Sequence, residues 1–454
     1  MSAERKLPGK EIPPRRFFPY VSVVTLLFAI YFVAGKLGLK LAFVNASATA
    51  VWPPTGIALA AFVMLGYRVW PGILLGAFLV NLTTAGSIAT SIGIAVGNTL
   101  EGLIGAYFVN RLANGRKAFD RPQDVFKFAV LAGIVSTMVS ATFGVASLSL
   151  GGLASWSQYR SVWLTWWLGD ATGALTVAPP LVLWTLNPRV RWNPARYFEA
   201  VVLLLSLCFL GLIAFGDLFG LGAKNYPLEF ICIPLVVWAA FRFGQREAAT
   251  ISFLLSGIAI WGTLRGFGPF VLKSANDSLL LLQAFMGLVA VMAVSLAAVI
   301  SERKQAEQAL GTNEGQLRLF VEHSPAAIAM FDRGMRYLIA SRRWLSDYGV
   351  RDVVGRSHYE VFPETPDRWK EIHRRCLAGD TERCEEDRFP RAGGGVDWVR
   401  WEIHPWRNTQ DEIGGIIIFT EVITDRKQAK DALKGKRGKL PRCSRNRQRL
   451  HHQD

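Results

Sequence analysis

Residues 278–310, SLLLLQAFMGLVAVMAVSLAAVISERKQAEQAL, place the strongest constraint on what this chain can fold into. Ser278–Ser301 is a run of 24 residues without a charge, and about 20 apolar residues suffice for a helix to cross a bilayer. From Ser301 the sequence becomes charged, but it contains no proline or glycine between Val289 and Leu310. We therefore predict one continuous helix that leaves a membrane and enters a soluble module, and that passes changes of packing between the two.

The composition divides the chain at the same place. Residues 17–300 are apolar with sparse charge, whereas residues 301–454 are rich in charge. The 51 basic and 35 acidic residues give a net charge of +16, and the basic residues cluster at the ends of apolar segments, as in membrane proteins. We find no nucleic-acid-binding motif and no paired cysteine spacing among the five cysteines, so we predict no nucleic-acid partner, no disulfide framework and no metal site.

The apolar region is predicted to be a polytopic, all-α membrane bundle. Ten segments are candidate spans: 17–35, 50–66, 69–86, 88–110, 124–150, 160–186, 198–216, 227–241, 247–264 and 278–300. The second is short and contains Pro53-Pro54. If it is re-entrant or merges with its neighbour, eight spans remain.

The basic residues between the segments indicate the orientation. With ten spans and the N-terminus inside, sixteen basic residues of residues 1–300 lie in the cytoplasm and six lie outside. This asymmetry is the positive-inside bias. It predicts a multi-pass protein of the bacterial inner membrane, with its N-terminus and everything after residue 301 in the cytoplasm.

Two acidic residues lie inside predicted spans. Glu101 shares a helix face with Gly93, Gly97 and Gly105, where small residues let another helix approach closely. Asp170 follows a tryptophan-rich run and shares a face with Trp167. Ionisable groups in a membrane are costly and usually face a cavity or a partner. They predict either a ligand, ion or proton site between helices or carboxyl groups that fix the packing of the spans.

Three motifs carry a family resemblance. They are Ala50–Leu59 (AVWPPTGIAL), Gly66–Ala77 (GYRVWPGILLGA) with Asn81, and Trp166–Gly173 (WWLGDATG) with Pro179. In this order they resemble the first class of MASE domains, membrane-associated sensor domains of bacteria, over residues 17–302. The resemblance implies a sensory input domain ahead of a histidine kinase or a diguanylate cyclase. It adds Trp52, Pro53, Asn81 and Trp167 to Glu101 and Asp170 as candidate ligand- or signal-sensing residues.

A short repeat flanks the soluble module. Ser301–Leu310 (SERKQAEQAL) and Thr424–Leu433 (TDRKQAKDAL) are identical at six of ten positions, 123 residues apart. We predict a helical connector at each end of one module. The first connector forms either a parallel coiled coil in a homodimer or a single solvated helix, because Leu310, Leu317 and Phe320 give only partial heptad spacing.

The module between the connectors has a β-β-α-α-β-β-β pattern. Ala326–Phe331 and Tyr337–Ala340 predict a hairpin, Arg342–Tyr348 and Pro366–Ala378 predict helices, and Val396–Trp406 and Gly415–Ile423 predict strands. Residues 315–426 are similar to a PAS domain, which implies a small α+β fold with a five-stranded antiparallel sheet and a sensory or dimerising role.

The exit from this module departs from the PAS pattern. The family commonly ends its last strand with Asp-Ile-Thr, whereas this chain has Val422-Ile423-Thr424 followed by Asp425-Arg426. These residues are the predicted coupling segment. We expect its coupling to a downstream partner to be weaker than, or different from, that of other PAS domains. The flavin-binding cysteine motif of light-sensing relatives is absent, and we predict no cofactor. A helical His373 could ligate haem, but the same sequence suits an ordinary amphipathic helix.

The predicted organisation has five parts: a basic N-terminus at 1–16, a membrane sensor domain at 17–300, a connector at 301–314, a PAS-like domain at 315–426, and a connector with a basic, disordered tail at 427–454. No kinase, phosphoacceptor or cyclase signature is present, so we predict no catalytic residues and an output domain supplied in trans or lost from the C-terminal part. The alternatives are a transporter with a regulatory domain, which would suit the broken helices and intramembrane acids, and a degenerate fragment without output.

Overall fold

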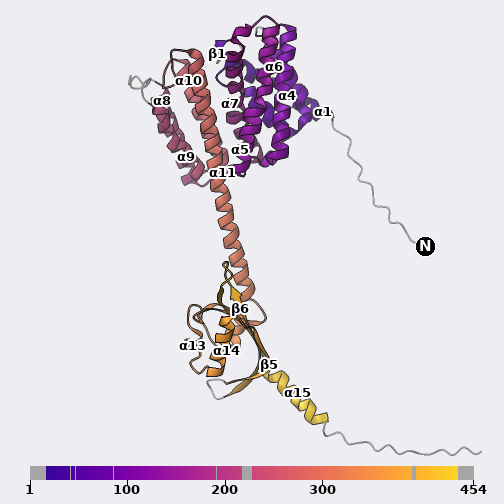
Figure 1. The fold of residues 1–454 in the computed structure, drawn as a ribbon, viewed down its shortest axis with the longest axis vertical. Helices are drawn as coiled ribbons and strands as arrows, with labels where there is room; N and C mark the ends of the chain where they lie inside the picture. The colour runs from indigo at the N-terminus through magenta and orange to yellow at the C-terminus, as the bar shows by residue number, and fades with distance from the viewer. Residues whose placement is uncertain are drawn as a thin grey trace, which may run out of the picture. The chain divides into compact units, whose positions relative to one another are not determined.

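The computed structural model describes residues 17–40, 42–45, 48–84, 86–190, 192–216, 227–390 and 395–437 (Figure 1). The predicted basic N-terminus, Gly393 and Gly394 of the turn that the run Gly393-Gly394-Gly395 predicts, and the tail beyond residue 437 lie outside these residues. The chain divides into two compact units, Met1–Ala306 and Glu307–Asp454.

The first unit is helical, and each of the ten predicted segments contains a helix. The α-helices are α1 (Phe17–Lys40), α2 (Pro53–Leu65), α3 (Trp70–Leu82), α4 (Ile88–Leu112), α5 (Pro122–Phe128), α6 (Thr137–Leu150), α7 (Tyr159–Leu186), α8 (Pro194–Phe215), α9 (Ile233–Arg242), α10 (Gln245–Leu264) and α11 (Ala275–Glu322). A π-helical turn, η3 (Ala129–Val135), joins α5 to α6, and the 3-10 turns η1 (Tyr67–Val69) and η6 (Leu228–Cys232) precede α3 and α9.

Six helical stretches of the described chain are long and apolar enough to cross a membrane. They are Tyr20–Lys40, Ile88–Leu112, Pro122–Leu150, Pro194–Phe215, Gln245–Leu264 and Ala275–Ala309. The 13-residue helices α2 and α3 are each about 20 Å long, which is short of the hydrocarbon thickness of about 30 Å. Length and composition therefore support fewer crossings than the ten predicted segments.

The turn η1 and helix α3 nevertheless run parallel to α1. The hydroxyl of Tyr20 donates to the carbonyl of Arg68 at 2.9 Å, and the Lys36 ammonium donates to the Thr84 hydroxyl at 2.9 Å. Both ends of the η1–α3 segment are thus tied to α1, and α2 connects the C-terminal end of α1 back to η1.

The segment before α2 is extended rather than helical. A two-stranded antiparallel sheet of β1 (Ala42–Asn45) and β2 (Ala48–Thr49) follows α1, and helix begins only at Pro53. Proline fits the first helical positions because they need no backbone donor. The predicted 50–66 span is therefore broken, with its helical half starting inside the protein.

Close approach of α2 to α7 fixes this broken helix in place. The backbone N–H of Trp52 donates to the carbonyl of Gly169 at 3.0 Å. A Cβ atom added to Gly173 would lie 2.1 Å from the Trp52 carbonyl oxygen, and one added to Gly56 would lie 2.4 Å from the Gly173 oxygen. Only glycine allows the two backbones to pack this closely.

Two large apolar clusters form the core of the first unit. One is built mainly from α1 to α5 and α7. The other is built from α8 to α11, and it includes Ala50 and Val51 from the extended segment before α2. The extended segment thus belongs to the core around α11, while the helix that follows it belongs to the other core.

The second unit is a five-stranded antiparallel sheet in the order β4-β3-β7-β6-β5. Its strands are β3 (Ala327–Asp332), β4 (Tyr337–Ala340), β5 (Glu382–Pro390), β6 (Val396–Arg407) and β7 (Ile413–Val422), and its helices are α12 (Arg342–Tyr348), α13 (His358–Val361) and α14 (Asp367–Ala378). Val399, Trp401 and Ile403 lie in the core, as their alternation predicts. This confirms the predicted α+β class.

Both predicted connectors are helical. The first is part of α11, which runs without a break to Glu322, and the second is part of α15 (Thr424–Arg437). On α11, Leu317 and Phe320 are 67% and 76% exposed within the chain.

Candidate functional site

Glu101 and Asp170, 69 positions apart in the sequence, meet at the N-terminus of α2. The hydroxyl of Thr55 is 3.3 Å from Glu101 Oε2 and 3.2 Å from Asp170 Oδ1. Thr55 lies in the first turn of α2, Glu101 in the middle of α4 and Asp170 in the middle of α7. The broken helix therefore places a hydroxyl between two carboxyl groups, and we call these three residues the carboxyl pair site.

The carboxyl pair site is buried. Glu101 and Asp170 are each 1% exposed and Thr55 is 4% exposed. Glu101 Oε1 and Asp170 Oδ2 are buried without a hydrogen-bond partner. Within the described residues, neither carboxyl group forms an ion pair with a lysine, arginine or histidine.

The glycine seam predicted around Glu101 packs against α6. A Cβ atom on Gly97 would lie 2.5 Å from the Phe143 Cβ, and one on Gly105 would lie 2.9 Å from the Ser136 hydroxyl. Gly102, which directly follows Glu101 on α4, approaches Phe62 of α2 instead. Glu101 is thus held where α4 is pressed against both α6 and α2.

A small cavity of about 20 Å³ adjoins Asp170, and this volume is enough for about one water molecule. Its lining includes Trp52, Asn81, Asn98 and Trp166. Three of the predicted residues, Trp52, Asn81 and Asp170, therefore surround one space. The polar groups at this space come from α3, α4 and α7.

A hydrogen-bonded network supports the cavity from the α4 side. Asn98 donates to the Tyr31 hydroxyl at 3.2 Å and accepts from the Ser140 hydroxyl at 2.7 Å. The Trp166 indole N–H donates to Ser140 Oγ at 3.3 Å. This network joins α1, α4, α6 and α7 and leaves the free carboxyl oxygens of Glu101 and Asp170 unused.

Two of the predicted residues, Pro53 and Trp167, do not line the cavity beside Asp170. Pro53 is the first residue of α2 and shapes the site by starting the helix there. Trp167 stacks on Trp163 with ring centroids 5.6 Å apart and donates to the Ile134 carbonyl at 2.9 Å. Trp166, rather than Trp167, faces the cavity.

The site is connected to α11 through Gln283, which is 1% exposed. Its side-chain amide donates to the carbonyl of Thr49 at 3.1 Å and to that of Thr165 at 3.4 Å. Thr165 also donates to Asn276 Oδ1 on α11 at 2.6 Å. Thr49 lies shortly before Trp52, and Thr165 lies shortly before Asp170 on α7. Helix α11 is therefore hydrogen-bonded to both segments that lead into the carboxyl pair site.

Sequence reasoning did not single out Thr55, Asn98, Ser140 or Gln283 as functional residues. One signal was available for Gln283, since it is the single amide in the uncharged run 278–301, and an amide in such a run needs a buried partner. Thr55 sits inside the Pro-Pro-Thr-Gly motif, but its two partners lie 46 and 115 residues away. Local patterns do not reveal partners so far apart.

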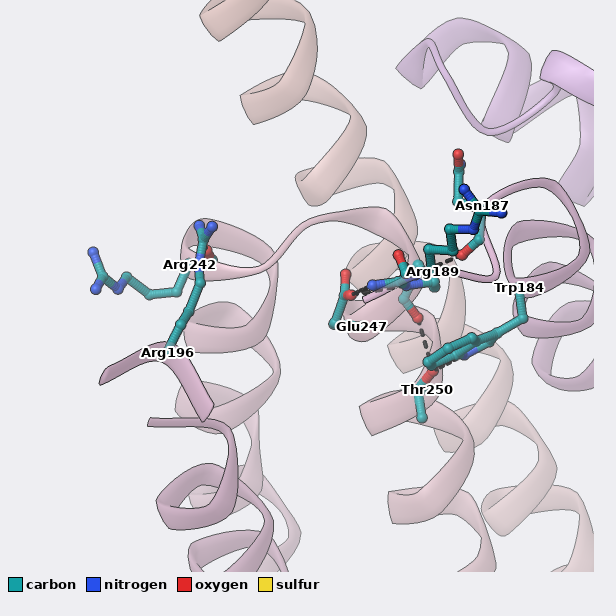
Figure 2. Close-up of polar contacts among 8 residues, drawn as sticks. Trp184, Asn187, Arg189, Arg196, Arg242, Glu247 and Thr250 are labelled. Atoms are coloured by element: carbon teal, nitrogen blue, oxygen red, sulfur yellow. Dashed lines mark hydrogen bonds and ion pairs between the residues drawn. The ribbon is translucent and has the colours of Figure 1, made fainter. Parts of the chain in front are cut away.

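Arginines gather where α7 ends and α10 begins (Figure 2). Arg246 lies over the Trp184 ring at 4.4 Å, pairs with Glu247, and donates to the carbonyls of Asn187 and Arg189. The Trp184 indole donates to the Thr250 hydroxyl at 2.9 Å.

A second pair of arginines belongs to the same end of the unit. Arg196 donates to the Arg242 carbonyl at 2.7 Å, and the Arg242 side chain pairs with Glu199 at 2.6 Å. Beside both groups lies an apolar cavity of about 160 Å³ that Trp184, Trp192 and Phe243 help to line. Arg189, Arg196, Arg242 and Arg246, which are among the sixteen basic residues predicted to lie on the cytoplasmic side, thus lie at one end of the helices.

The predicted coupling segment is tied to the PAS sheet by Thr424. Its hydroxyl donates to Asp397 Oδ1 at 3.0 Å and accepts from the Trp398 N–H at 3.0 Å. Val422, at the position of the missing aspartate, is half-buried against the core of the PAS unit. Asp425 and Arg426 are exposed. An acidic residue on β6 therefore holds the outgoing helix, and Val422 contributes apolar packing.

An ion pair also connects the start of α15 to the sheet. Lys427 pairs with Glu386 of β5, and its ammonium lies 4.6 Å from the centre of the Trp398 ring. The start of α15 is thus held by both β5 and β6.

His373 lies in an aromatic cluster inside the PAS unit. It is 2% exposed, and its Nδ1 is 3.1 Å from the Tyr359 hydroxyl. The His358 ring lies 5.5 Å from it, and His358 Nδ1 is 2.8 Å from the Tyr337 hydroxyl. Burial lowers the pKa of His373 to about 4, and burial together with the neighbouring His373 lowers the pKa of His358 to about 3. Both imidazoles are therefore neutral at pH 7, each engaged by a tyrosine hydroxyl.

Comparisons with known proteins agree with this division of the chain. The MASE1 family profile matches residues 23–304, and the PAS fold profile matches residues 321–428. The chain is 21% identical over 398 residues to a probable diguanylate cyclase, DgcE, of Escherichia coli K12. That alignment covers 84% of this chain but only 34% of the relative, so the chain spans about a third of the relative's length.

Among solved structures, two PAS domains are similar to part of this chain. The PAS domain of Bordetella pertussis BvgS is 20% identical, with a TM-score of 0.23, covering 28% of this chain and 99% of that domain. A PAS domain from Colwellia psychrerythraea is 15% identical, with a TM-score of 0.22, covering 25% of this chain and 98% of that domain. The profile matches extend over most of the chain, and the chain therefore belongs to the MASE1 family, with a PAS domain following its membrane domain.

Proposed function

We propose that this chain is the sensory input of a bacterial inner-membrane signalling protein in which the state of the carboxyl pair site is passed along α11 to the PAS domain. The MASE1 and PAS matches support a membrane sensor module. They favour the sensor over the transporter that the broken helix and the intramembrane acids also suggest.

The observation that carries this proposal is the position of Gln283. Its amide bonds to Thr49 and Thr165 lie on the two segments that lead to Thr55 and Asp170. A change in the carboxyl pair site that moves either segment must break or shift a bond to α11. Since α11 continues without interruption to Glu322, a rotation or shift at Gln283 is proposed to pass along this helix.

The output is proposed to be a diguanylate cyclase or, as the alternative, a histidine kinase, supplied in trans or by a longer form of the chain. Support for the cyclase comes from the relative's name, and the relative extends well beyond the aligned region. Thr424 and Lys427, which fasten α15 to the sheet, are the proposed exit point of the signal.

A homodimer is part of the proposal. Leu317 and Phe320 on α11 expose most of their apolar surface within one chain, and apolar side chains at this spacing are buried when two helices pair. A second copy pairing along residues 301–322 would cover them.

The arginines in Figure 2 support the predicted orientation. Four basic side chains at one end of the unit fit an anionic cytoplasmic leaflet. The outward apolar residues of α1 and α8, among them Leu26 and Phe198 at 62% and 72% exposure, fit contact with lipid tails. The N-terminus and the PAS domain are then cytoplasmic.

A fusion tests the relay. Residues 1–437 placed ahead of a diguanylate cyclase domain and reconstituted in lipid nanodiscs should give cyclase activity that changes when Glu101 and Asp170 are replaced by Gln and Asn. Gln283→Leu should reduce that difference, while Gln305→Leu, on the exposed part of α11, should preserve it. Equal activity of the fusion with and without the two carboxyl groups would contradict the relay.

A further inference from the structure

The carboxyl pair site lacks a positive charge. Two buried carboxyl groups face one Thr55 hydroxyl, and a hydroxyl has one hydrogen to donate. At any moment one of the two carboxyl groups is therefore without that bond. Two ionised carboxylates sharing a buried site repel each other, and burial alone already penalises each charge.

The surrounding elements do not supply the missing charge. The residues that α2, α6 and α11 contribute to the network are Thr55, Ser140 and Gln283, all uncharged. The titratable neighbour is Tyr31 on α1, which already accepts a hydrogen bond from Asn98. The N-terminus of α2 provides a partial positive charge of roughly half a unit, which offsets part of one carboxylate.

The unused atoms at the site are oxygens. Glu101 Oε1 and Asp170 Oδ2 have no partner and are inaccessible to solvent, and buried polar atoms without a partner require an explanation such as an unseen ion. Asp170 also borders the cavity of about 20 Å³. The Asp170 carboxyl group therefore lies beside a space for about one small particle, and oxygen donors are the ligands that small hard cations select.

We infer that Glu101, Asp170 and Thr55 bind one small monovalent cation, Na⁺ or a proton in its place, and that this cation is the ligand of the membrane domain. That the cation is the ligand sensed by the membrane domain rests on the proposed function. That the site binds a cation rests on the geometry alone. A monovalent charge suits a pair whose negative charge is partly offset by α2. Within the described residues, no three His, Cys, Asp or Glu side chains form a group that could hold a metal ion, so the proposed ligands are the two carboxyl groups and the Thr55 hydroxyl.

Competition between Na⁺ and protons follows from the same carboxyl groups. A carboxyl group must lose its proton before it can ligate a metal ion, so cation affinity rises with pH. For exchange of one proton, the Na⁺ concentration at half-saturation should increase about tenfold for each unit by which the pH falls below the carboxyl pKa.

The test is thermal unfolding of the full chain in lipid nanodiscs, followed by tryptophan fluorescence. NaCl replaces choline chloride at constant ionic strength, from about 1 to about 300 mM, at several pH values, because a ligand that binds only the folded state raises the unfolding midpoint. The wild-type midpoint should rise with NaCl, and more at high pH than at low pH. Glu101→Gln and Asp170→Asn should remove most of this rise, and Thr55→Val should weaken the response more than Thr55→Ser.

Asp124→Asn is the matched control. Asp124 is 3% exposed like the site residues, but its carboxylate is paired with Lys127 at 3.0 Å and accepts from Asn114. Its replacement should lower the midpoint and leave the response to Na⁺ intact.

Three outcomes decide whether the site binds a cation. A Na⁺ response lost in the site variants identifies Na⁺ as the occupant. A pH response without a Na⁺ response, again lost in those variants, identifies the proton. Equal responses of wild type and Glu101→Gln/Asp170→Asn to both ions would overturn the inference. If the cation binds and the cyclase fusion does not respond to it, the site stands and the relay fails.

Discussion

Gln283 of α11 donates a hydrogen bond to the carbonyl of Thr49, which precedes it by 234 residues and lies 3.1 Å away. This bond joins the helix that leaves the membrane domain to the extended segment that begins the broken helix α2. It places α11 next to a segment that would have to move if the carboxyl pair site changed its state.

Gln283→Leu should destabilise the membrane domain. The substitution keeps the size of the side chain but leaves the Thr49 and Thr165 carbonyls without a donor, which costs about 1–3 kcal/mol for a buried group. The unfolding midpoint in nanodiscs measures this loss. Gln305→Leu, on the exposed part of the same helix, should leave the midpoint within experimental error; equal effects of both variants would show that Gln283 does not hold the segment.

Gly173→Ala should separate α2 from α7. The added methyl group would lie 2.1 Å from the Trp52 oxygen, and relief of such an overlap costs typically about 1–3 kcal/mol. The variant should unfold at lower temperature and should respond more weakly to Na⁺, because Thr55 moves with α2.

Gly257→Ala provides the comparison for this substitution. A Cβ atom on Gly257 of α10 meets nothing within 4 Å, and alanine favours helix by up to about 1 kcal/mol over glycine. Gly257→Ala should therefore be neutral or stabilising. A Gly173→Ala variant as stable as Gly257→Ala would contradict the close packing of α2 and α7.

Much of this organisation was accessible from the sequence, because it depends on local patterns. The change at Ser301 predicted a helix that leaves the apolar region, and α11 is continuous there. The alternation in 396–406 predicted the buried face of β6, with Val399, Trp401 and Ile403 in the core. Glu101 and Asp170 stood out because a carboxyl group in an apolar run is costly wherever it lies.

What the sequence could not supply are the partners of these residues. Trp166 and Trp167 are adjacent, and neighbouring residues of a helix point about 100° apart. Trp166 therefore lines the cavity, whereas Trp167 packs on Trp163. The hairpin before α2 was missed because its strands are only four and two residues long. Thr55 is a site residue only because it lies between Glu101 and Asp170, which are on two different helices.

The PAS domain should lose stability in acid through its two buried histidines. Their pKa values in the folded state, about 3 for His358 and about 4 for His373, lie below the unfolded value of about 6.5. Below about pH 6.5 the unfolded chain gains protons that the folded domain does not, so stability is complete above that pH and falls as the pH drops toward 4, by up to about 1.4 kcal/mol per unit for each histidine.

Hydrogen exchange in β3, β6 and β7 of the full chain measures this effect as a function of pH. His373→Leu should make the acid-induced loss less steep. His404→Asn, at a half-exposed position on β6, should leave its steepness unchanged. A profile that is flat between pH 6.5 and pH 4 would show that the histidines are not held neutral by burial.

Thr424→Val should loosen the start of α15. The hydroxyl joins Asp397 to the Trp398 N–H, and loss of such a bond at the start of a helix costs about 1 kcal/mol. Hydrogen exchange should become faster in residues 424–437 and remain unchanged in β3. Asp425→Asn, whose side chain is exposed, is the control, and faster exchange in both variants would argue against a specific role for Thr424.

Hydrogen exchange of residues 301–322 and of the PAS domain in wild type and Glu101→Gln/Asp170→Asn, both as full chains in nanodiscs, tests the central claim most directly. The claim is that the state of the carboxyl pair site reaches the soluble domain through α11. Neutralising the two carboxyl groups should change exchange in α11 beyond Ser301 and in the PAS sheet. Exchange that differs only around α2, α4 and α7, and is identical from Ser301 onward, would contradict it.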